Sequence, residues 1–399
     1  MIVMDVKIDN FVSFKNFHMN MSYPKKIVGS YIDNEFLRDR TNFRYKKVNI
    51  IMGANASGKT SIGKMLMTFF NFMVKKQYEN LTDVICDVTQ NASFEIDFVT
   101  NKTLLYRVKT IIRPRHGEKY QSEDIDVTVT SMEIGVKDSY ETCAKRIALK
   151  KEEKADSYIQ ELEKIKGLSW MFEYPFDSTE GSRGTYIPTN PKRYLHVLEN
   201  ILKTLDPAIL KVEKSDEIEN TYIIRYMNRS VIIQDGKLID SNVLSSGTKA
   251  GIEIAGVLTS ISEGQYGFYF CDEKFSYIHS DIEKAILAVM ISKLHENEQL
   301  FFTTHNTNIL DIPLPKHSFL FLQKDMNDKD EPIKCISASI LLKRNTDCLK
   351  NAVEKIQGFS ADRRIRRGRE QTTKIGIWTR RQLPDGGFRY LINENNPTI

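Results

Sequence analysis

The sequence VNIIMGANASGKT, residues 48–60, decides the fold. Its first five residues are apolar except for Asn49, as in a strand that a parallel sheet buries on both faces. The remainder matches the pattern GxxxxGK[ST], in which a glycine-rich loop leads from a strand into a helix. Apolar residues then recur at helical spacing over residues 61–76. This order of strand, glycine loop and helix predicts an α/β protein.

A loop of this kind binds the phosphates of a nucleotide. Its backbone N–H groups wrap around phosphate oxygens, so glycine is needed where a Cβ would block a close approach. The next helix adds unpaired N-terminal N–H groups and the positive end of its dipole. We expect Lys59 to bridge the β- and γ-phosphates of ATP, and the Thr60 hydroxyl to ligate Mg²⁺. The predicted cofactor-binding residues of the loop are Gly53, Asn55, Ala56, Ser57, Gly58, Lys59, Thr60 and Ser61.

Two further apolar strands end in polar residues. The first, residues 267–271, leads into Asp272 and Glu273 at its carboxyl end, where α/β sheets place their ligands. We expect Asp272 to hold Mg²⁺ through its water shell and Glu273 to act as general base on the attacking water. The second strand, residues 299–304, precedes His305, which we expect to contact the γ-phosphate or orient water. With Lys59, the predicted catalytic residues are Glu273 and His305.

Residues 244–249, LSSGTK, complete a set of four motifs and lie shortly before the Asp-Glu pair. In this order the motifs resemble those of the ABC-type ATPases of the SMC/RecF/OLD group, whose signature loop LSGGQ has this place. Ser246 stands here for the first glycine and Thr248 for the glutamine. The resemblance implies an ABC-type P-loop ATPase head with a mixed β-sheet lobe. It also implies that Ser245 and Gly247 cap the γ-phosphate held by a second copy, so that two chains enclose two ATP molecules.

Each motif also has a purely structural explanation. The Ser245–Gly247 turn can be a helix N-cap, and an acidic strand end can be an ordinary turn. A lone histidine is more often structural than catalytic. The glutamine that the resemblance implies near the metal is unassigned between Gln90 and Gln121. The occurrence of all four motifs in one order favours the functional interpretation.

The size of the chain indicates which members of this ATPase group it resembles most. Lys59 and Ser245 are 186 residues apart, too few to hold the coiled coil of an SMC protein. The size is similar to that of short prokaryotic anti-phage defence ATPases, relatives of the OLD, Septu and PARIS ATPases. OLD proteins continue into a TOPRIM nuclease, whereas fewer than 80 residues follow the predicted strand 319–322. The resemblance therefore implies a homo-oligomeric ATPase that controls a separate effector, a nuclease or a toxin.

Other functions remain open from the sequence. The main alternative is an ATP-dependent DNA-binding repair protein similar to RecF or SMC. A transporter's nucleotide-binding subunit would need a membrane partner, and a scaffold that does not hydrolyse ATP would tolerate substitution of Lys59. A neighbouring nuclease, toxin or permease gene would separate these alternatives.

Changes in composition and in hydrophobic pattern along the sequence predict that the chain is divided into four regions. We expect an N-terminal lobe with the P-loop over 1–140, a helical insertion over 141–206, a C-terminal lobe over 207–345 and a basic tail over 346–399. The tail contains the arginine-rich segment Arg363–Arg381. This segment is compatible with nucleic-acid binding, with a solvated or oligomer-contacting tail, and with docking of an acidic effector.

The composition excludes several classes of protein. With 399 residues, 41% hydrophobic and 27% charged, the chain is globular rather than disordered or collagen-like. The net charge of +5 is too small to indicate nucleic acid by itself. No apolar run approaches the roughly 18 residues of a membrane span. The five scattered cysteines have no metal-binding spacing and predict reduced thiols, so we expect a cytoplasmic protein without a membrane partner.

Overall fold

The chain forms two compact units, Met1–Ala352 and Val353–Ile399. The described part of the second unit is the hairpin of β18 (Trp378–Gln382) and β19 (Phe388–Ile392). Most of the predicted basic tail, with most of Arg363–Arg381, lies outside the described residues. The computed structural model describes residues 1–27, 30–100, 103–150, 155–174, 188–239, 243–342 and 349–350, and the backbone of 378–382 and 388–392.

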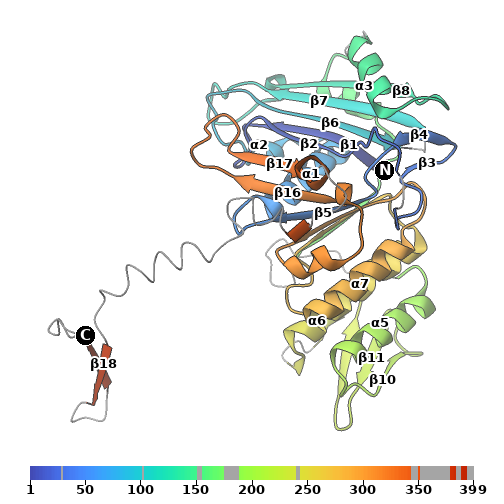
Figure 1. The fold of residues 1–399 in the computed structure, drawn as a ribbon, viewed down its shortest axis with the longest axis vertical. Helices are drawn as coiled ribbons and strands as arrows, with labels where there is room; N and C mark the ends of the chain where they lie inside the picture. Colours follow the sequence, from blue (N-terminus) through green and yellow to red (C-terminus); the bar gives the residue numbers. More distant parts are fainter. Residues whose placement is uncertain are drawn as a thin grey trace. The chain divides into compact units, whose positions relative to one another are not determined.

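A six-stranded sheet of order β17-β16-β5-β15-β14-β9 carries the P-loop (Figure 1). All neighbouring strands are parallel except β16 and β17. The strands β5, β14 and β15 are buried along their whole length, as the sequence predicts. Parallel strands end at one edge of a sheet, so the residues that follow these three strands meet there. The strands are β5 (Val48–Gly53), β9 (Trp170–Glu173), β14 (Phe268–Asp272), β15 (Gln299–Thr304), β16 (Phe319–Lys324) and β17 (Ile333–Ser337).

A second, antiparallel sheet has the order β2-β1-β6-β7-β8. Polar side chains cover its β8 edge, which would otherwise expose unpaired backbone groups. The carboxylate of Glu161 accepts a hydrogen bond from Val129 N at 2.9 Å, and Lys150 Nζ donates to Ser131 O at 2.8 Å. The strands are β1 (Ile2–Asp9), β2 (Phe17–Asn20), β6 (Ala92–Thr100), β7 (Leu104–Ile112) and β8 (Ile125–Glu133), with a separate hairpin of β3 (Phe36–Leu37) and β4 (Arg40–Arg44).

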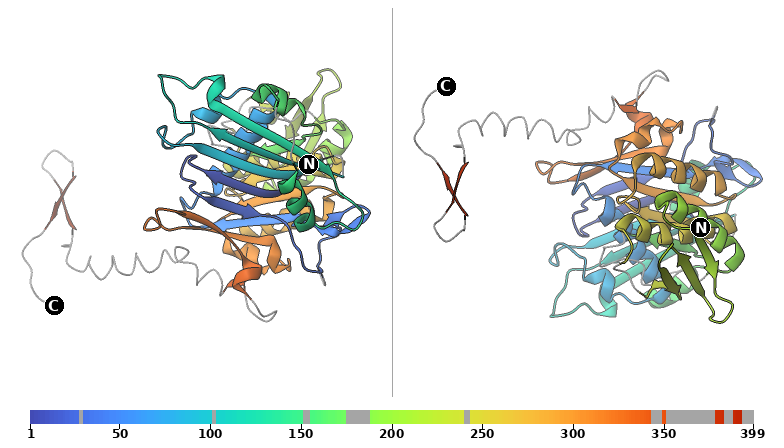
Figure 2. Two further views of the ribbon diagram at one scale, coloured as in Figure 1. Left: turned by 90° about the horizontal axis from the view of Figure 1, so that it is seen from above. Right: turned by 90° about the horizontal axis from the view of Figure 1, so that it is seen from below.

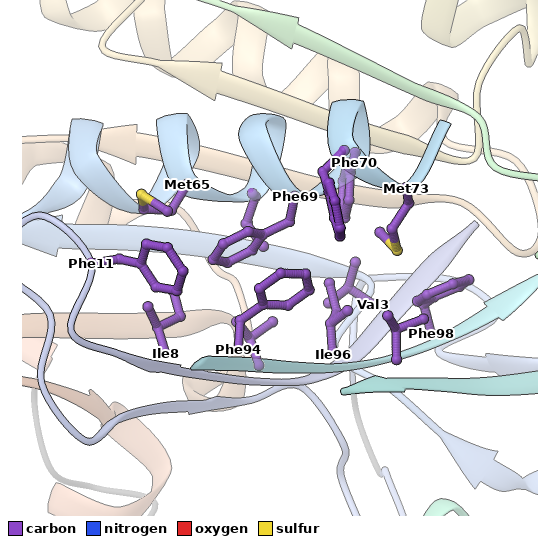
Figure 3. Close-up of a cluster of buried hydrophobic side chains, with 14 of the residues drawn as sticks. Val3, Ile8, Phe11, Met65, Phe69, Phe70, Met73, Phe94, Ile96 and Phe98 are labelled. Carbon is purple, nitrogen blue, oxygen red and sulfur yellow. The ribbon is translucent and has the colours of Figure 1, made fainter. Parts of the chain in front are cut away.

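Helix α1 (Lys59–Lys75) lies between the two sheets and buries apolar side chains on both sides. Figure 3 shows Phe69 above Phe94 of the antiparallel sheet, and the two rings stack with centroids 4.0 Å apart. On the other side, Phe70 meets Phe268 of β14 edge to face at 5.3 Å. Because both sides of α1 are packed, the start of the helix is held in a fixed place relative to β14.

Helices also cover the opposite face of the six-stranded sheet (Figure 2). Side chains alternate along β14, so Tyr269 points away from α1, and its hydroxyl donates to Ser260 O of α6 at 3.1 Å. Helix α5 packs against α6, with Leu205 and Leu202 close to Gly251. These elements are α5 (Pro191–Leu205), α6 (Ser246–Glu263) and α7 (Ser280–Lys293), with a small sheet of β10 (Lys211–Lys214), β11 (Thr221–Arg225), β12 (Ser230–Gln234) and β13 (Lys237–Leu238).

The segment 141–206, predicted as a helical insertion, contains a strand of the main sheet. β9 pairs in parallel with β14 and forms the edge of the sheet. Four residues are too short to show a strand pattern, and the pairing with β14 decides their conformation. The same segment contains two short helices, α3 (Tyr140–Leu149) and α4 (Tyr158–Glu163), with 151–154 outside the described residues. The short helices are α2 (Glu79–Thr82), α8 (Ala338–Leu341), η1 (Ser122–Asp124), η3 (Thr307–Asp311) and η4 (Lys316–Ser318).

Among the described residues, no helix combines the length and the apolar character that crossing a bilayer requires. The cysteines of the described part are free thiols, namely Cys86, Cys143, Cys271 and Cys335.

The contact between α1 and β14 can be tested at Gly63. A Cβ at this position would lie 2.4 Å from Cε1 of the buried Phe270 ring, which is too close for two carbon atoms. We expect Gly63→Ala to lower the free energy of unfolding by about 1–2 kcal/mol, because overpacking outweighs the better helix propensity of alanine. Urea unfolding measures the change. Gly117→Ala is the control, because nothing lies within 4 Å of a Cβ there, and equal stabilities of the two variants would contradict the packing.

Candidate nucleotide-binding site

The loop between β5 and α1 has the tight geometry of a phosphate-binding loop. A Cβ at Gly53 would lie 2.3 Å from Ser57 Oγ, so only glycine fits there. Gly58 has φ +103° and Ala56 has φ +62°, the left-handed conformation. Within the part that the structure describes, the buried Ser57 Oγ has no hydrogen-bond partner, and Asn55 is exposed beside it. An orphaned buried hydroxyl in a tight loop fits a site that a polar ligand completes.

Lys59 and Glu273, two of the predicted catalytic residues, lie together. The Lys59 side chain is only 4% exposed, and its Nζ is 3.2 Å from Glu273 Oε1. The same Nζ donates to Gly53 O at 2.9 Å and to Ala54 O at 3.2 Å, so the loop itself holds the ammonium in place. Lys59 thus places one buried cation at the end of β14, where phosphate oxygens could take the place of Glu273 as its partner.

Thr60 and Asp272, the two predicted metal residues, are joined directly. Thr60 Oγ1 donates to Asp272 Oδ2 at 2.7 Å, across 212 positions of sequence. Thr303 Oγ1 donates to the other oxygen, Asp272 Oδ1, at 2.6 Å. Burial raises the pKa of Asp272 above its ordinary value, although the hydrogen bonds from Thr303 and Thr60 oppose this change. A carboxylate buried in this way gains most from a bound cation.

Thr303 also positions Glu273, and the sequence analysis missed it. The backbone N of Glu273 donates to Thr303 Oγ1 at 3.0 Å and to Thr303 O at 3.2 Å. Glu273 has φ +41°, a strained value for a residue with a side chain, which persists only where neighbours enforce it. The signal was present in the sequence, because an apolar strand that ends in two threonines beside a predicted histidine places hydroxyls at the site.

His305 lies at the edge of the group, with its Nδ1 3.8 Å from Glu273 Oε1 and its side chain 57% exposed. The residues on either side of it are held by the buried carboxylate of Glu283 on α7. Thr304 Oγ1 donates to Glu283 at 3.1 Å and Asn306 Nδ2 donates to it at 2.5 Å. Burial raises the pKa of Glu283, while these hydrogen bonds lower it. No pattern in the sequence points to this residue, because a glutamate on a helix usually faces water.

The predicted signature residues lie at the start of α6. Ser245 is the N-cap of this helix and accepts a hydrogen bond from Thr248 N at 3.1 Å. A Cβ at Gly247 would lie 3.1 Å from Tyr277 O, which favours glycine there. The N-cap explanation is thus confirmed within one chain, and the capping of a second copy's phosphate stays a prediction.

The two candidate glutamines form hydrogen bonds to residues near them in the sequence. Gln121 N donates to Asp124 beside η1, and Gln90 N donates to Asp87 O in the turn before β6. The assignment of a glutamine to the metal therefore stays a prediction. Ser61 is half-buried in the first turn of α1.

The donor set fits Mg²⁺ bound together with a nucleotide. Mg²⁺ keeps several waters and takes one or two carboxylates plus phosphate oxygens. No cluster of three or more His, Cys, Asp or Glu side chains that could cage a metal occurs in the described ranges. One carboxylate, Asp272, beside one hydroxyl, Thr60, is the arrangement that this chemistry requires.

Comparison with known proteins rests on structure. No family model matches the sequence, and no curated protein matches it. An SMC head crystallised with the C-winged helix domain of ScpA aligns with a TM-score of 0.50 and 12% identity, over 86% of this chain and 100% of that one. The chain has the fold of an SMC ATPase head. The predicted mixed α/β class of an ABC-type head is therefore confirmed.

Two more SMC heads match over similar lengths. The head domain from Thermotoga maritima has a TM-score of 0.42 and 15% identity, over 84% of this chain and 99% of that one. The head with an extended coiled coil from Pyrococcus furiosus, bound to the C-terminal domain of ScpA, has a TM-score of 0.49 and 11% identity, over 86% and 98%.

The burial of Asp272 predicts a pH dependence of stability. Its pKa is raised in the fold above the ordinary value of 3.8, so ionising it costs stability as pH rises from about 4 through the folded pKa. The uncharged variant Asp272→Asn escapes this cost. We expect its free energy of unfolding, relative to the wild type, to increase between pH 4 and pH 7 in urea titrations.

Asp328→Asn is the control of opposite sign. A hydrogen bond from Lys334 lowers the pKa of Asp328 to about 2, so its ionised form stabilises the fold at all pH values above about 5. This variant should be less stable than the wild type by a constant amount between pH 5 and pH 7. A difference for Asp272→Asn that is flat or falls with pH would show that its carboxylate is not penalised by burial.

Proposed function

We propose that this chain is an ABC-type ATPase that binds ATP with Mg²⁺ and hydrolyses it. The proposal is carried by one observation: a hydrogen bond and an ion pair connect the P-loop to the end of β14. Thr60 is bonded to Asp272 at 2.7 Å, and Lys59 is 3.2 Å from Glu273. Residues of these types at these two places are what phosphoryl transfer to water requires. The SMC-head fold supports the proposal as a class of ATPase.

Each side chain has a distinct role in this proposal. Lys59 and the loop N–H groups bind the phosphates, and Thr60 with Asp272 holds the metal. When bound, Mg²⁺ neutralises phosphate charge and orients the phosphoryl group. Glu273 orients a water molecule and accepts its proton, and its fixed backbone keeps the carboxylate in place. His305, 3.8 Å from Glu273, helps to orient that water.

The proposal includes a second copy of the chain. Ser245 and Gly247 are at the exposed start of α6 and bond only locally to their own helix end in the described chain. One chain offers one P-loop and one signature, so two chains would complete two sites. We propose a dimer or a higher even oligomer that closes on ATP and opens after hydrolysis.

We further propose a biological role as a sensor and regulator in anti-phage defence. In this role the ATPase binds a separate effector protein, a nuclease or a toxin, and the ATP cycle controls when the effector is released. The proposal rests on the resemblance of the motifs and on their spacing, with Lys59 and Ser245 186 residues apart. The alternative is a DNA-repair protein similar to RecF, in which ATP controls binding to duplex DNA, with Arg363–Arg381 as candidate phosphate contacts.

ATP turnover tests the enzymatic proposal. We expect the wild type to release phosphate from ATP in a Mg²⁺-dependent manner. Lys59→Ala should lose nucleotide binding, because it removes the buried cation of the loop. Glu273→Gln should keep ATP binding and lower kcat by about 10²–10⁴, because it removes the general base. A wild type that neither binds nor hydrolyses ATP would disprove the proposal, and turnover by Glu273→Gln at the wild-type rate would disprove the role of that residue.

Copurification separates the two biological roles. Tagged Glu273→Gln, isolated from its native cells, should retain a stoichiometric effector protein that Lys59→Ala does not retain. A repair protein would instead bind duplex DNA in an ATP-dependent manner, with affinity falling steeply with added salt. ATP-dependent DNA binding without a retained protein would therefore contradict the defence role.

A further inference from the structure

A buried lysine follows the proposed base directly. The Lys274 side chain is 1% exposed, although no phosphate chemistry in the proposed mechanism uses it. Its Nζ lies 2.9 Å from Glu173 Oε2, forms a second ion pair with Glu253, and donates to Tyr174 O at 2.7 Å. Burying an ammonium costs free energy, which its three anionic or carbonyl partners offset. The elements that carry these partners therefore cannot move away without leaving a buried charge unpaired.

The three partners belong to different elements. Glu173 and Tyr174 are at the carboxyl end of β9, the edge strand that the sequence did not predict. Glu253 lies on α6, eight positions after the N-cap Ser245. Lys274 itself is covalently joined to Glu273. One ammonium therefore connects the end of β14, the end of β9 and the helix that begins at the signature turn.

The charges of this cluster depend on one another. The side chains of Lys274 and Glu173 are only 1% and 8% exposed, so neither charge can reach water without leaving its partner. Burial raises the pKa of Glu253, which the charge of Lys274 opposes. Since Lys274 is paired with carboxylates on both β9 and α6, displacing α6 would move the ammonium rather than leave it behind.

Glu273 is sensitive to such a pull. Its backbone is held on one side by the hydrogen bonds from its N–H to Thr303 and on the other by the anchored Lys274. Its φ of +41° lies in a narrow well that exists only while both neighbours hold it. A small movement of Lys274 therefore changes where the Glu273 carboxylate points.

We propose that Lys274 is a positioning residue that ties the signature helix α6 to the base Glu273, so that the contact of Ser245 with one nucleotide sets the base for the other. This inference rests on the ATPase function proposed above. The lysine site of a chain acts on the nucleotide bound by its own P-loop, whereas Ser245 meets the nucleotide of the second copy. The tie thus couples the two ATP sites of a pair.

The test removes the charges together. Lys274→Met alone would leave two carboxylates buried without a cation. That would destabilise the fold, so a loss of activity could not be assigned to the tie. The triple variant Lys274→Met/Glu173→Gln/Glu253→Gln keeps the shapes and removes the three charges. We expect ATP affinity within twofold of the wild type, because the P-loop is untouched, and a kcat at least tenfold lower. The Hill coefficient for ATP should fall from about 2 to about 1, which a loss of stability alone would not produce.

A single substitution keeps the test valid if the triple variant does not fold. Glu253→Gln leaves Lys274 paired with Glu173 and removes the negative charge on α6, so the ion pair that forms the tie is lost and cooperativity should fall as in the triple variant. Glu263→Gln is the matched control, since Glu263 is on the same helix but accepts hydrogen bonds from Thr189 and Gln265. It should retain the wild-type kcat and Hill coefficient.

The outcomes separate the two proposals. A wild type that hydrolyses ATP cooperatively, together with a Glu253→Gln or triple variant that does the same, overturns the tie and leaves the ATPase proposal standing. A wild type with a Hill coefficient of 1 also overturns the tie. A wild type without ATP binding or turnover overturns both.

Discussion

The hydrogen bonds to the buried Asp272 carboxylate are the interaction on which the site depends. They bring Thr60, at the start of α1, and Thr303, at the end of β15, to the end of β14. A carboxylate that has lost its water is stable only with such partners, and each charge-assisted hydrogen bond contributes about 1.5–3 kcal/mol. Three segments that are far apart in the sequence are thereby fixed at one edge of the sheet. The packing of α1 between two sheets makes that arrangement rigid (Figure 3).

Around this centre, the other charged groups are also buried in pairs. Lys59 faces Glu273, and Lys274 faces Glu173 and Glu253. Such pairs add little net stability, because the cost of removing both charges from water offsets their attraction. Their effect is on geometry, since a buried pair cannot rearrange without exposing an unpaired charge. A site built in this way keeps its side chains in place before any ligand arrives, which is what electrostatic catalysis requires.

Much of the fold and of the site could be predicted from the sequence. The run at Val48–Gly53 and the spacing after Lys59 specify a strand, a loop and a helix, because period and glycine placement are local properties. Thr303 and Glu283 were missed because their roles are set by partners 31 and 21 positions away. The strand Trp170–Glu173 was missed for the same reason, since β14 induces it. What escaped prediction is the set of contacts that exist only after the sheet has formed.

In the proposed oligomer, each nucleotide is enclosed by the P-loop of one chain and the signature turn of another. Sedimentation velocity of Glu273→Gln with saturating ATP and Mg²⁺ measures whether this pairing forms. We expect a monomer without nucleotide, a dimer or higher even oligomer with it, and a monomer again when Ser245→Arg is added to the same chain, because the bulky cation blocks the signature turn. A Glu273→Gln protein that binds ATP fully and still sediments as a monomer would rule the pairing out.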